Sequence, residues 1–196
     1  MTELKRKAFV ALDFSNINRA FDTIRQTHAM PPTTKLNYER LVSIITPGDN
    51  LLSKNVYMGT KNAVDPTLQH RFLRYFQRNG FNIVTKECKV IKKIDGTKIR
   101  KANFDDKIIY DIMQHIWNRE CGEIVLMSGD SDFAYVMDRI KKLGFKITIV
   151  SSEATISGEL RALADDLILI DYLDLDYLRF DKPVRADQKT SFQIAA

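Results

Sequence analysis

The stretch Ile124-Val125-Leu126-Met127-Ser128-Gly129-Asp130-Ser131-Asp132-Phe133 places four apolar residues directly before a glycine turn and two carboxylates. A short continuous apolar run is typical of a strand that is buried on both faces of a parallel sheet. Gly129 is expected to let the chain turn sharply after this strand. A helical pattern follows up to about Leu143, and Gly144 is expected to end it. This strand–turn–helix unit indicates an α/β fold.

Strand-like and helix-like segments alternate along most of the chain. Strands are expected at 9–12, 55–58, 81–84, 124–127, 146–150 and 167–170, with helical patterns near 15–28, 37–45, 66–78, 104–116, 133–143, 157–163 and 175–178. Ser15 or Asn16 is expected to cap the first helix. Such alternation predicts a mainly parallel central sheet with helices on both faces. We expect one domain over residues 1–180, followed by a C-terminal tail, 181–196, that lacks periodicity.

The net charge of +5 is concentrated in one segment. Residues 86–101 hold seven Lys or Arg and two Asp or Glu, while the rest of the chain balances at 23 of each sign. Asp95-Gly96 is a turn signal, so we predict a projecting basic β-hairpin here. Its candidate residues for contacts with a polyanion are Lys89, Lys92, Lys93, Lys98, Arg100 and Lys101. A run of charge is more often a solvated face, and this alternative stays open.

Composition excludes several classes of protein. Cys88 and Cys121 form no CxxC pair, and no histidine accompanies them at zinc-site spacing, which argues against a zinc ribbon or a disulfide scaffold. The charged start of the chain does not resemble a signal peptide. No apolar run approaches the roughly 18 residues that a membrane-spanning helix needs. We therefore expect a cytoplasmic protein without a membrane partner.

Carboxylates are expected at the carboxyl ends of two strands and at the start of one helix. Asp13 ends the first strand, Asp130 and Asp132 follow the most apolar strand, and Asp105 begins a helix. Ligands of open α/β sheets bind beyond the carboxyl ends of the strands, so these acids are expected to face one crevice. Converging carboxylates repel one another unless cations neutralise them, and oxygen ligands suit Mg²⁺ or Mn²⁺. Such an ion can activate water toward a phosphodiester, which points to a metal-dependent nuclease.

Each of these acids also has a structural explanation. Asp130 or Ser131 can cap the helix that follows, and Asp105 can favour its own helix N-terminus through the helix dipole. Asp106 and Asp111 are expected at the surface or in local ion pairs. For an isolated Asp-Ser-Asp turn, capping is at least as good an explanation as catalysis.

The motifs taken together are more specific than any one of them. DFSN at residues 13–16 and SGDSDF at 128–133 resemble the motifs of the NYN domain family, in the LabA-like branch of the PIN-domain ribonuclease superfamily. Asp105 and Asp111, six residues apart, match the two acids of the family's helix. SGELRALAD at 157–165 is similar to the family's closing helix. The four motifs occur in the family's order.

The resemblance covers residues 8–170 and implies a PIN-like three-layer α/β/α domain with a Mg²⁺- or Mn²⁺-dependent ribonuclease site. The residues that it implies as metal ligands and catalytic acids are Asp13, Asp105, Asp130 and Asp132, with Asn16 and Ser128 as polar support. One position departs from the family pattern, because Lys101 lies four residues before Asp105 rather than three. Ala102 stands where the family has lysine, so Lys101 is carried over only as a phosphate contact.

The leading hypothesis is a metal-dependent endoribonuclease whose basic hairpin guides RNA to the acids. The alternative is an RNA-binding or nucleic-acid-binding regulatory module with a weak or inactive site. A phosphatase of the strand-end aspartate type fits less well, because Phe14 and Ser15 follow Asp13 where Asp-x-Asp would be needed. The sequence leaves open whether the chain forms a homodimer, for example through its tail.

Overall fold

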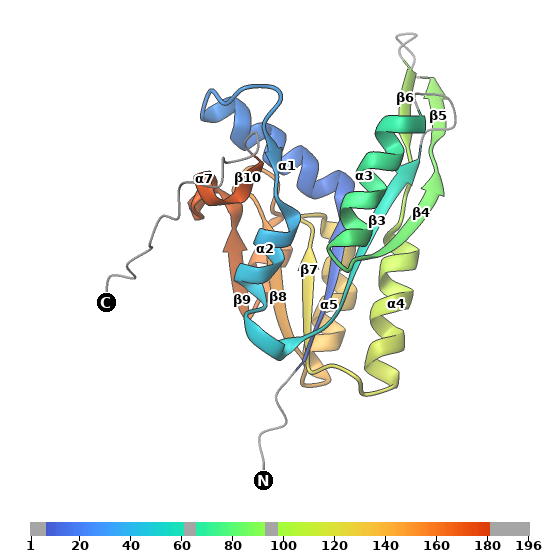
Figure 1. Cartoon of the computed structure of the whole chain (residues 1–196). Helices are drawn as coiled ribbons and strands as arrows, with labels where there is room; N and C mark the ends of the chain where they lie inside the picture. The colour runs from blue at the N-terminus through green and yellow to red at the C-terminus, as the bar shows by residue number, and fades with distance from the viewer. Residues whose placement is uncertain (1–6, 61–65, 93–97, 181–196) are drawn as a thin grey trace.

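A six-stranded sheet lies between two layers of helices in this computed structural model, which describes residues 7–60, 66–92 and 98–180 (Figure 1). The spatial order is β4 (Asn82–Glu87), β3 (Leu51–Thr60), β1 (Ala8–Asp13), β7 (Glu123–Met127), β8 (Lys146–Ser151) and β9 (Asp166–Leu169). Every neighbouring pair is parallel. The predicted three-layer α/β class with a parallel sheet is confirmed.

The direction of strand addition reverses between β1 and β7. From β1 the chain builds outward through β3 to β4, and it then returns to add β7, β8 and β9 on the other side of β1. In open α/β sheets, ligands bind at the carboxyl ends of the strands that flank such a switch point. Asp13 closes β1 and Ser128 follows β7, so both residues lie where this rule predicts a site.

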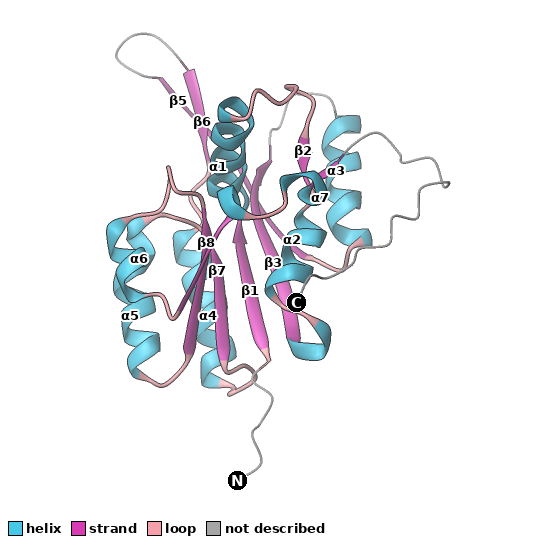
Figure 2. Ribbon diagram, turned by 90° about the vertical axis from the view of Figure 1, so that its left-hand side faces the viewer, coloured by secondary structure: helices cyan, strands magenta, loops and turns pink. Residues whose placement is uncertain are grey.

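Helices cover both faces of the sheet (Figure 2). One face carries α1 (Phe14–Thr27), α2 (Tyr38–Ile45), α3 (Pro66–Arg78) and α7 (Leu175–Leu178), and the other carries α4 (Asp105–Trp117), α5 (Ala134–Lys142) and α6 (Gly158–Leu163). The short 3₁₀ turns are η1 (Gly48–Asn50), η2 (Ser131–Phe133) and η3 (Ile170–Tyr172). Within β1, Val10 and Leu12 pack into the first core, whereas Phe9 and Ala11 pack into the second. Successive strand residues point to opposite faces, which explains why the β1 sequence is apolar throughout.

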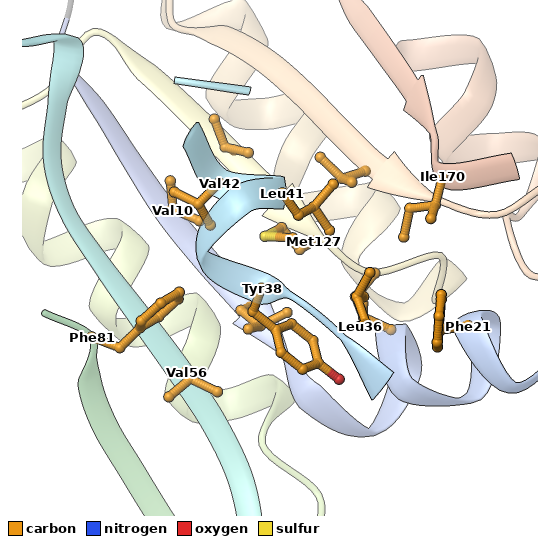
Figure 3. Close-up of a cluster of buried hydrophobic side chains, with 14 of the residues drawn as sticks. Val10, Phe21, Leu36, Tyr38, Leu41, Val42, Val56, Phe81, Met127 and Ile170 are labelled. Atoms are coloured by element: carbon orange, nitrogen blue, oxygen red, sulfur yellow. The ribbon is translucent and has the colours of Figure 1, made fainter. Parts of the chain in front are cut away.

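The core on the α1 side gathers side chains from elements far apart in the sequence (Figure 3). Four fully buried side chains belong to this one cluster: Val10 of β1, Leu41 of α2, Met127 of β7 and Ile170 of η3. Burial of a leucine-sized side chain contributes about 1.5–3 kcal/mol. This core therefore holds the switch-point strands firmly beneath the ends that carry Asp13 and Ser128.

Two small antiparallel pairs lie outside the main sheet. The predicted basic hairpin is present as β5 (Lys89–Lys92) and β6 (Lys98–Lys101), and it extends beyond the carboxyl end of the sheet (Figure 1). Its turn, 93–97, lies outside the described residues. A second pair, β2 (Lys35–Leu36) with β10 (Arg179–Phe180), was not predicted. Each of these strands has only two residues, which is too short for an alternation of apolar and polar residues to show.

The expected cap of the first helix is wrong by two or three residues. Asp13 itself is the N-cap of α1, so the strand passes into the helix without a loop. The third strand is also longer than the expected 55–58, because its first residues pair with the start of β1 from Leu51 onward. The tail, 181–196, lies outside the described residues, and no helix in the described part of the chain is long and apolar enough to cross a membrane.

Candidate functional site

Asp13 is held by hydrogen bonds at both of its carboxylate oxygens. Oδ1 accepts from the Ser15 hydroxyl at 2.8 Å and from the Asn16 backbone N–H at 3.1 Å. Oδ2 accepts a longer bond of 3.5 Å from the Ser128 hydroxyl. The residue is 8% exposed. Asp13 therefore caps α1 and at the same time has its carboxylate fixed at the switch point.

The loop after β7 is tied to the same place. The Gly129 backbone N–H donates to Asn16 Oδ1 at 3.0 Å, across 113 positions of sequence. The Asp130 N–H donates to the buried Ser128 hydroxyl at 3.3 Å, and Asp130 Oδ1 accepts from the Asp132 N–H at 3.2 Å. Asp130 is thus the N-cap of η2, as the structural explanation expected. Asn16 and Ser128, expected as polar support, bridge the ends of β1 and β7.

Gly129 is required for a reason other than the expected sharp turn. A Cβ atom at this position would collide with the Thr155 carbonyl group and would lie 2.6 Å from Ser151 Oγ. The segment after β8 packs directly on Gly129, whose carbonyl oxygen accepts from the Ser157 N–H at 2.9 Å. A side chain at residue 129 would therefore push this segment away from the loop that carries Asp130.

The charges of the other three acids affect the pKa of Asp105. It begins α4, is partly buried, and its backbone N–H donates to Asn103 Oδ1 at 2.8 Å. Burial raises the pKa of Asp105, and the charges of Asp130, Asp13 and Asp132 raise it further, whereas a side-chain interaction with Asn103 at the carboxylate lowers it. Mutual repulsion of this kind is relieved when a cation binds between the acids.

The chemistry of these donors fits a hard divalent cation. All four side chains offer carboxylate oxygens, which are the ligands that Mg²⁺ and Mn²⁺ prefer. Within the described residues, however, no three His, Cys, Asp or Glu side chains already lie at metal-holding distances from one another. Asp132 is exposed and Asp130 partly exposed, so their side chains have room to turn toward a cation.

Similarity to known proteins identifies the family. The model of the NYN domain matches residues 7–171. The chain belongs to the NYN domain family. It is 30% identical over 135 residues to the low amplitude and bright protein LabA of Synechococcus elongatus, and the match covers 68% of this chain and 67% of that protein. The crystal structure of a protein of unknown function from Vibrio parahaemolyticus has the same fold, with a TM-score of 0.69, 23% identity, and coverage of 92% of this chain and 99% of that one.

Asp111 of this NYN domain has a structural role away from the other acids. Its Oδ2 accepts a hydrogen bond of 2.7 Å from the Tyr57 hydroxyl on β3. Burial and this bond raise the pKa of Tyr57. Asp111 is not among the charges that shift Asp105, although both lie on α4. Asp111 is partly exposed, which agrees with the expected surface position, but its partner among the described residues is the buried Tyr57 hydroxyl rather than a cation.

Asn103 is a residue of the candidate site that the sequence analysis missed. Its side chain holds the N-terminus of α4, and its carbonyl oxygen accepts from Lys86 Nζ at 3.2 Å. Asn-x-Asp before a helical stripe is a local signal for such a turn, because asparagine bonds readily to the backbone two residues on. Asn103 thus links the end of β4 to the helix that carries Asp105.

The basic residues lie on the hairpin beside this site. Lys89 is exposed on β5, and its register partner on β6 is Lys101. Lys92 is the register partner of Lys98, and Arg100 lies opposite Val90. Lys93 lies outside the described residues. The hairpin thus sets lysine opposite lysine at two positions.

Proposed function

We propose that this NYN domain is a metal-dependent endoribonuclease that hydrolyses RNA phosphodiester bonds. The observation that carries the proposal is that four carboxylates lie near the topological switch point, where burial raises the pKa of Asp105 and the charges of Asp130, Asp13 and Asp132 raise it further. Perturbed pKa values of this kind cluster at functional sites. Family membership makes an RNA substrate the natural choice, because NYN domains belong to the PIN-like nuclease superfamily.

Each residue has a role in this proposal. Asp13, Asp105, Asp130 and Asp132 would hold Mg²⁺ or Mn²⁺. When bound, such an ion lowers the pKa of water and offsets negative charge on phosphorus-bound oxygens. Ser128 and Asn16 orient the loop and the carboxylates through the bonds described above. Asn103 holds the helix end that presents Asp105.

The hairpin would bind the RNA backbone. Like charges directly opposite each other in an antiparallel pair are destabilising, and here Lys89 faces Lys101 and Lys92 faces Lys98. A polyanion laid along the hairpin would relieve this repulsion and release its own counterions. The hairpin extends past the sheet end that carries the acids, so a strand bound there leads toward Asp105 (Figure 1).

A cleavage assay tests the proposal. The purified chain is incubated with single-stranded RNA and with DNA of the same sequence, in Mn²⁺, in Mg²⁺ and in EDTA. RNA cleavage is expected only with a divalent ion, and Asp13→Asn or Asp130→Asn is expected to slow it about 100-fold or more. Asp138→Asn is the matched control, because Asp138 pairs with Lys142 on the surface of α5. Equal cleavage in EDTA, or full activity in both site variants, would contradict the proposal.

A second candidate is an RNA-binding module with a weak or inactive site. It is favoured by one observation, the lack of a ready-formed group of metal ligands among the described residues. It predicts salt-dependent RNA binding in the absence of cleavage. Single-turnover cleavage by the wild type that Asp130→Asn abolishes would rule it out.

A further inference from the structure

A pocket of about 290 Å³ lies between α1, α3 and the β2–β10 pair. This volume is at the lower end of the range for small-molecule sites, about 300–1,000 Å³. Phe14, the residue after Asp13, packs on two of its walls, with ring centroids 5.0 Å from Phe72 and 5.6 Å from Tyr38. Phe14, which follows Asp13 in the chain, therefore packs against the walls of the pocket.

Aromatic side chains form much of the pocket. Phe72 and Tyr75 of α3 and Phe180 of β10 all line it. Tyr75 and Phe180 meet edge to face, with centroids 5.1 Å apart, and Phe180 is 42% exposed. Exposed aromatic rings in concave sites stack readily on nucleobases, because every base has a π-face.

Tyr38 brings to the pocket a hydroxyl that has no hydrogen-bond partner among the described residues. Its side chain is 3% exposed, and its hydroxyl makes no hydrogen bond within the described part of the chain. Figure 3 shows this hydroxyl directed away from the apolar cluster around Val10 and Met127. The Tyr75 hydroxyl, by contrast, accepts from the Glu39 N–H and donates to Asn37 Oδ1, both at 3.1 Å. The Tyr38 hydroxyl is not among the fully enclosed atoms that lack a partner, so it is accessible to a ligand atom in the pocket.

The rim of the pocket is positive. Lys35 of β2 and Arg71 of α3 line it and are exposed. Neither side chain forms an ion pair with another described residue, and no acid is among the described residues that line the pocket. Two cations without an ion pair among the described residues, beside exposed aromatic rings, match the mixed chemistry of a nucleotide.

We propose that this pocket binds one unpaired nucleobase of the RNA strand, stacked on the aromatic side chains, hydrogen-bonded to the Tyr38 hydroxyl, and flanked by phosphates at Lys35 and Arg71. The inference rests on the proposed function for the identity of the polymer. A base held here would contact Tyr38 and Phe72, which pack against Phe14, the residue that follows Asp13. The pocket and the hairpin then contact the RNA at different points along the strand.

Binding of mononucleotides to the full chain tests the inference without relying on cleavage. The four 5′-ribonucleoside monophosphates are titrated by NMR, with ribose 5-phosphate as the probe that lacks a base. Tyr38→Phe removes only the hydroxyl and is expected to weaken nucleotide binding about three- to tenfold. Phe180→Ala is expected to weaken it about fivefold or more. Tyr172→Phe, at a tyrosine that is 76% exposed outside the pocket, should bind like the wild type.

Several outcomes would overturn the inference and leave the proposed function intact. One is RNA binding by the wild type together with unchanged nucleotide affinity in Tyr38→Phe and Phe180→Ala. Another is equal affinity for ribose 5-phosphate and the nucleotides, since stacking would then contribute nothing. A change of sedimentation in the pocket variants would assign the pocket to a second copy of the chain. Absence of all RNA binding and cleavage would instead refute the proposed function.

Discussion

The side-chain oxygen of Asn16 accepts a hydrogen bond of 3.0 Å from the backbone N–H of Gly129. Asn16 lies in the first turn of α1, and Gly129 lies in the loop after β7. The two segments carry Asp13 and Asp130, so this bond adds to the pairing of β1 with β7 in holding the two loops together. Asn16 is 3% exposed, which means that water cannot readily replace it.

Replacement of Asn16 by alanine is expected to destabilise the protein by about 1–3 kcal/mol, because the buried Gly129 N–H would lose its acceptor. Urea unfolding measures the change. Asn18→Ala is the control on the same helix, since the Asn18 amide bonds to Asp22 at 3.2 Å, within that helix. The control should change stability by about 0.5 kcal/mol or less. Equal effects of the two variants would show that the bond to Gly129 contributes little.

Two glycines are expected to respond to alanine in opposite ways. Gly129→Ala places a Cβ against the Thr155 carbonyl group and should cost about 1–3 kcal/mol through forced movement of the backbone. Gly158→Ala meets no atom within 4 Å and begins α6, so it should stabilise by about 0.4–1 kcal/mol. Thermal unfolding of both variants measures the contrast. A Gly129→Ala protein as stable as the wild type would contradict the close packing described here.

The sequence predicts the fold well because its strongest signals are local. Continuous apolar runs mark β1 and β7, and Phe104, Ile108, Ile112 and Ile116 mark the buried stripe of α4. The positions of Asp13 and Asp130 in the fold are predictable for the same reason, since Asp13 ends one such run and Asp130 lies three residues after the other. Parallel strands then bring both acids to one edge of the sheet.

What the sequence misses depends on contacts between distant segments. The true constraint on Gly129 comes from Thr155, which reaches it only after β8 is in place. The β2–β10 pair likewise joins Leu36 to Arg179 across almost the whole chain, through strands too short to show a period. The pocket that this pair helps to form was therefore not predictable. Asn103 is the exception, because its Asn-x-Asp signal lies in the local sequence directly before α4.

The pH dependence of stability is expected to reveal the repulsion at Asp105. Its raised pKa means that the folded protein holds the proton more tightly than the unfolded chain does. Its contribution to stability is thus fully present below the ordinary pKa of 3.8 and is lost as the pH rises through the raised value. Asp105→Asn removes the ionisation. The stability of this variant relative to the wild type should therefore increase between about pH 3 and about pH 7 in the absence of divalent ions.

Asp165→Asn is the control with the opposite sign. The Lys141 ammonium and the Ile147 N–H lower the pKa of Asp165 through hydrogen bonds. The Asp165 carboxylate therefore stabilises the folded protein above its ordinary pKa, and this stabilisation is lost as the pH falls through the lowered value. Relative to the wild type, Asp165→Asn should therefore lose stability on going from acid to neutral pH. Thermal unfolding across this range distinguishes the two, and the same trend in both variants would contradict the assignment at Asp105.

Charge reversal on the hairpin is expected to separate RNA binding from stability. Lys89→Glu with Lys92→Glu sets each glutamate opposite a lysine, Lys101 or Lys98, and opposite charges across an antiparallel pair contribute about 0.2–1 kcal/mol each. The double variant should therefore be at least as stable as the wild type. Its affinity for single-stranded RNA should nevertheless fall. The slope of log affinity against log salt is negative, and its magnitude should decrease by about 1.4, or about 0.7 for each lost phosphate contact.

The control for this variant reverses two charges at the other end of the sheet. Arg119 follows α4 and Lys142 ends α5, each just before the amino end of a strand. Arg119→Glu with Lys142→Glu changes the net charge by the same amount, so it measures the effect of overall charge alone. Fluorescence anisotropy over a salt series compares the three proteins. If both double variants weaken RNA binding equally, the net charge of the domain guides the RNA, and the hairpin has no particular role.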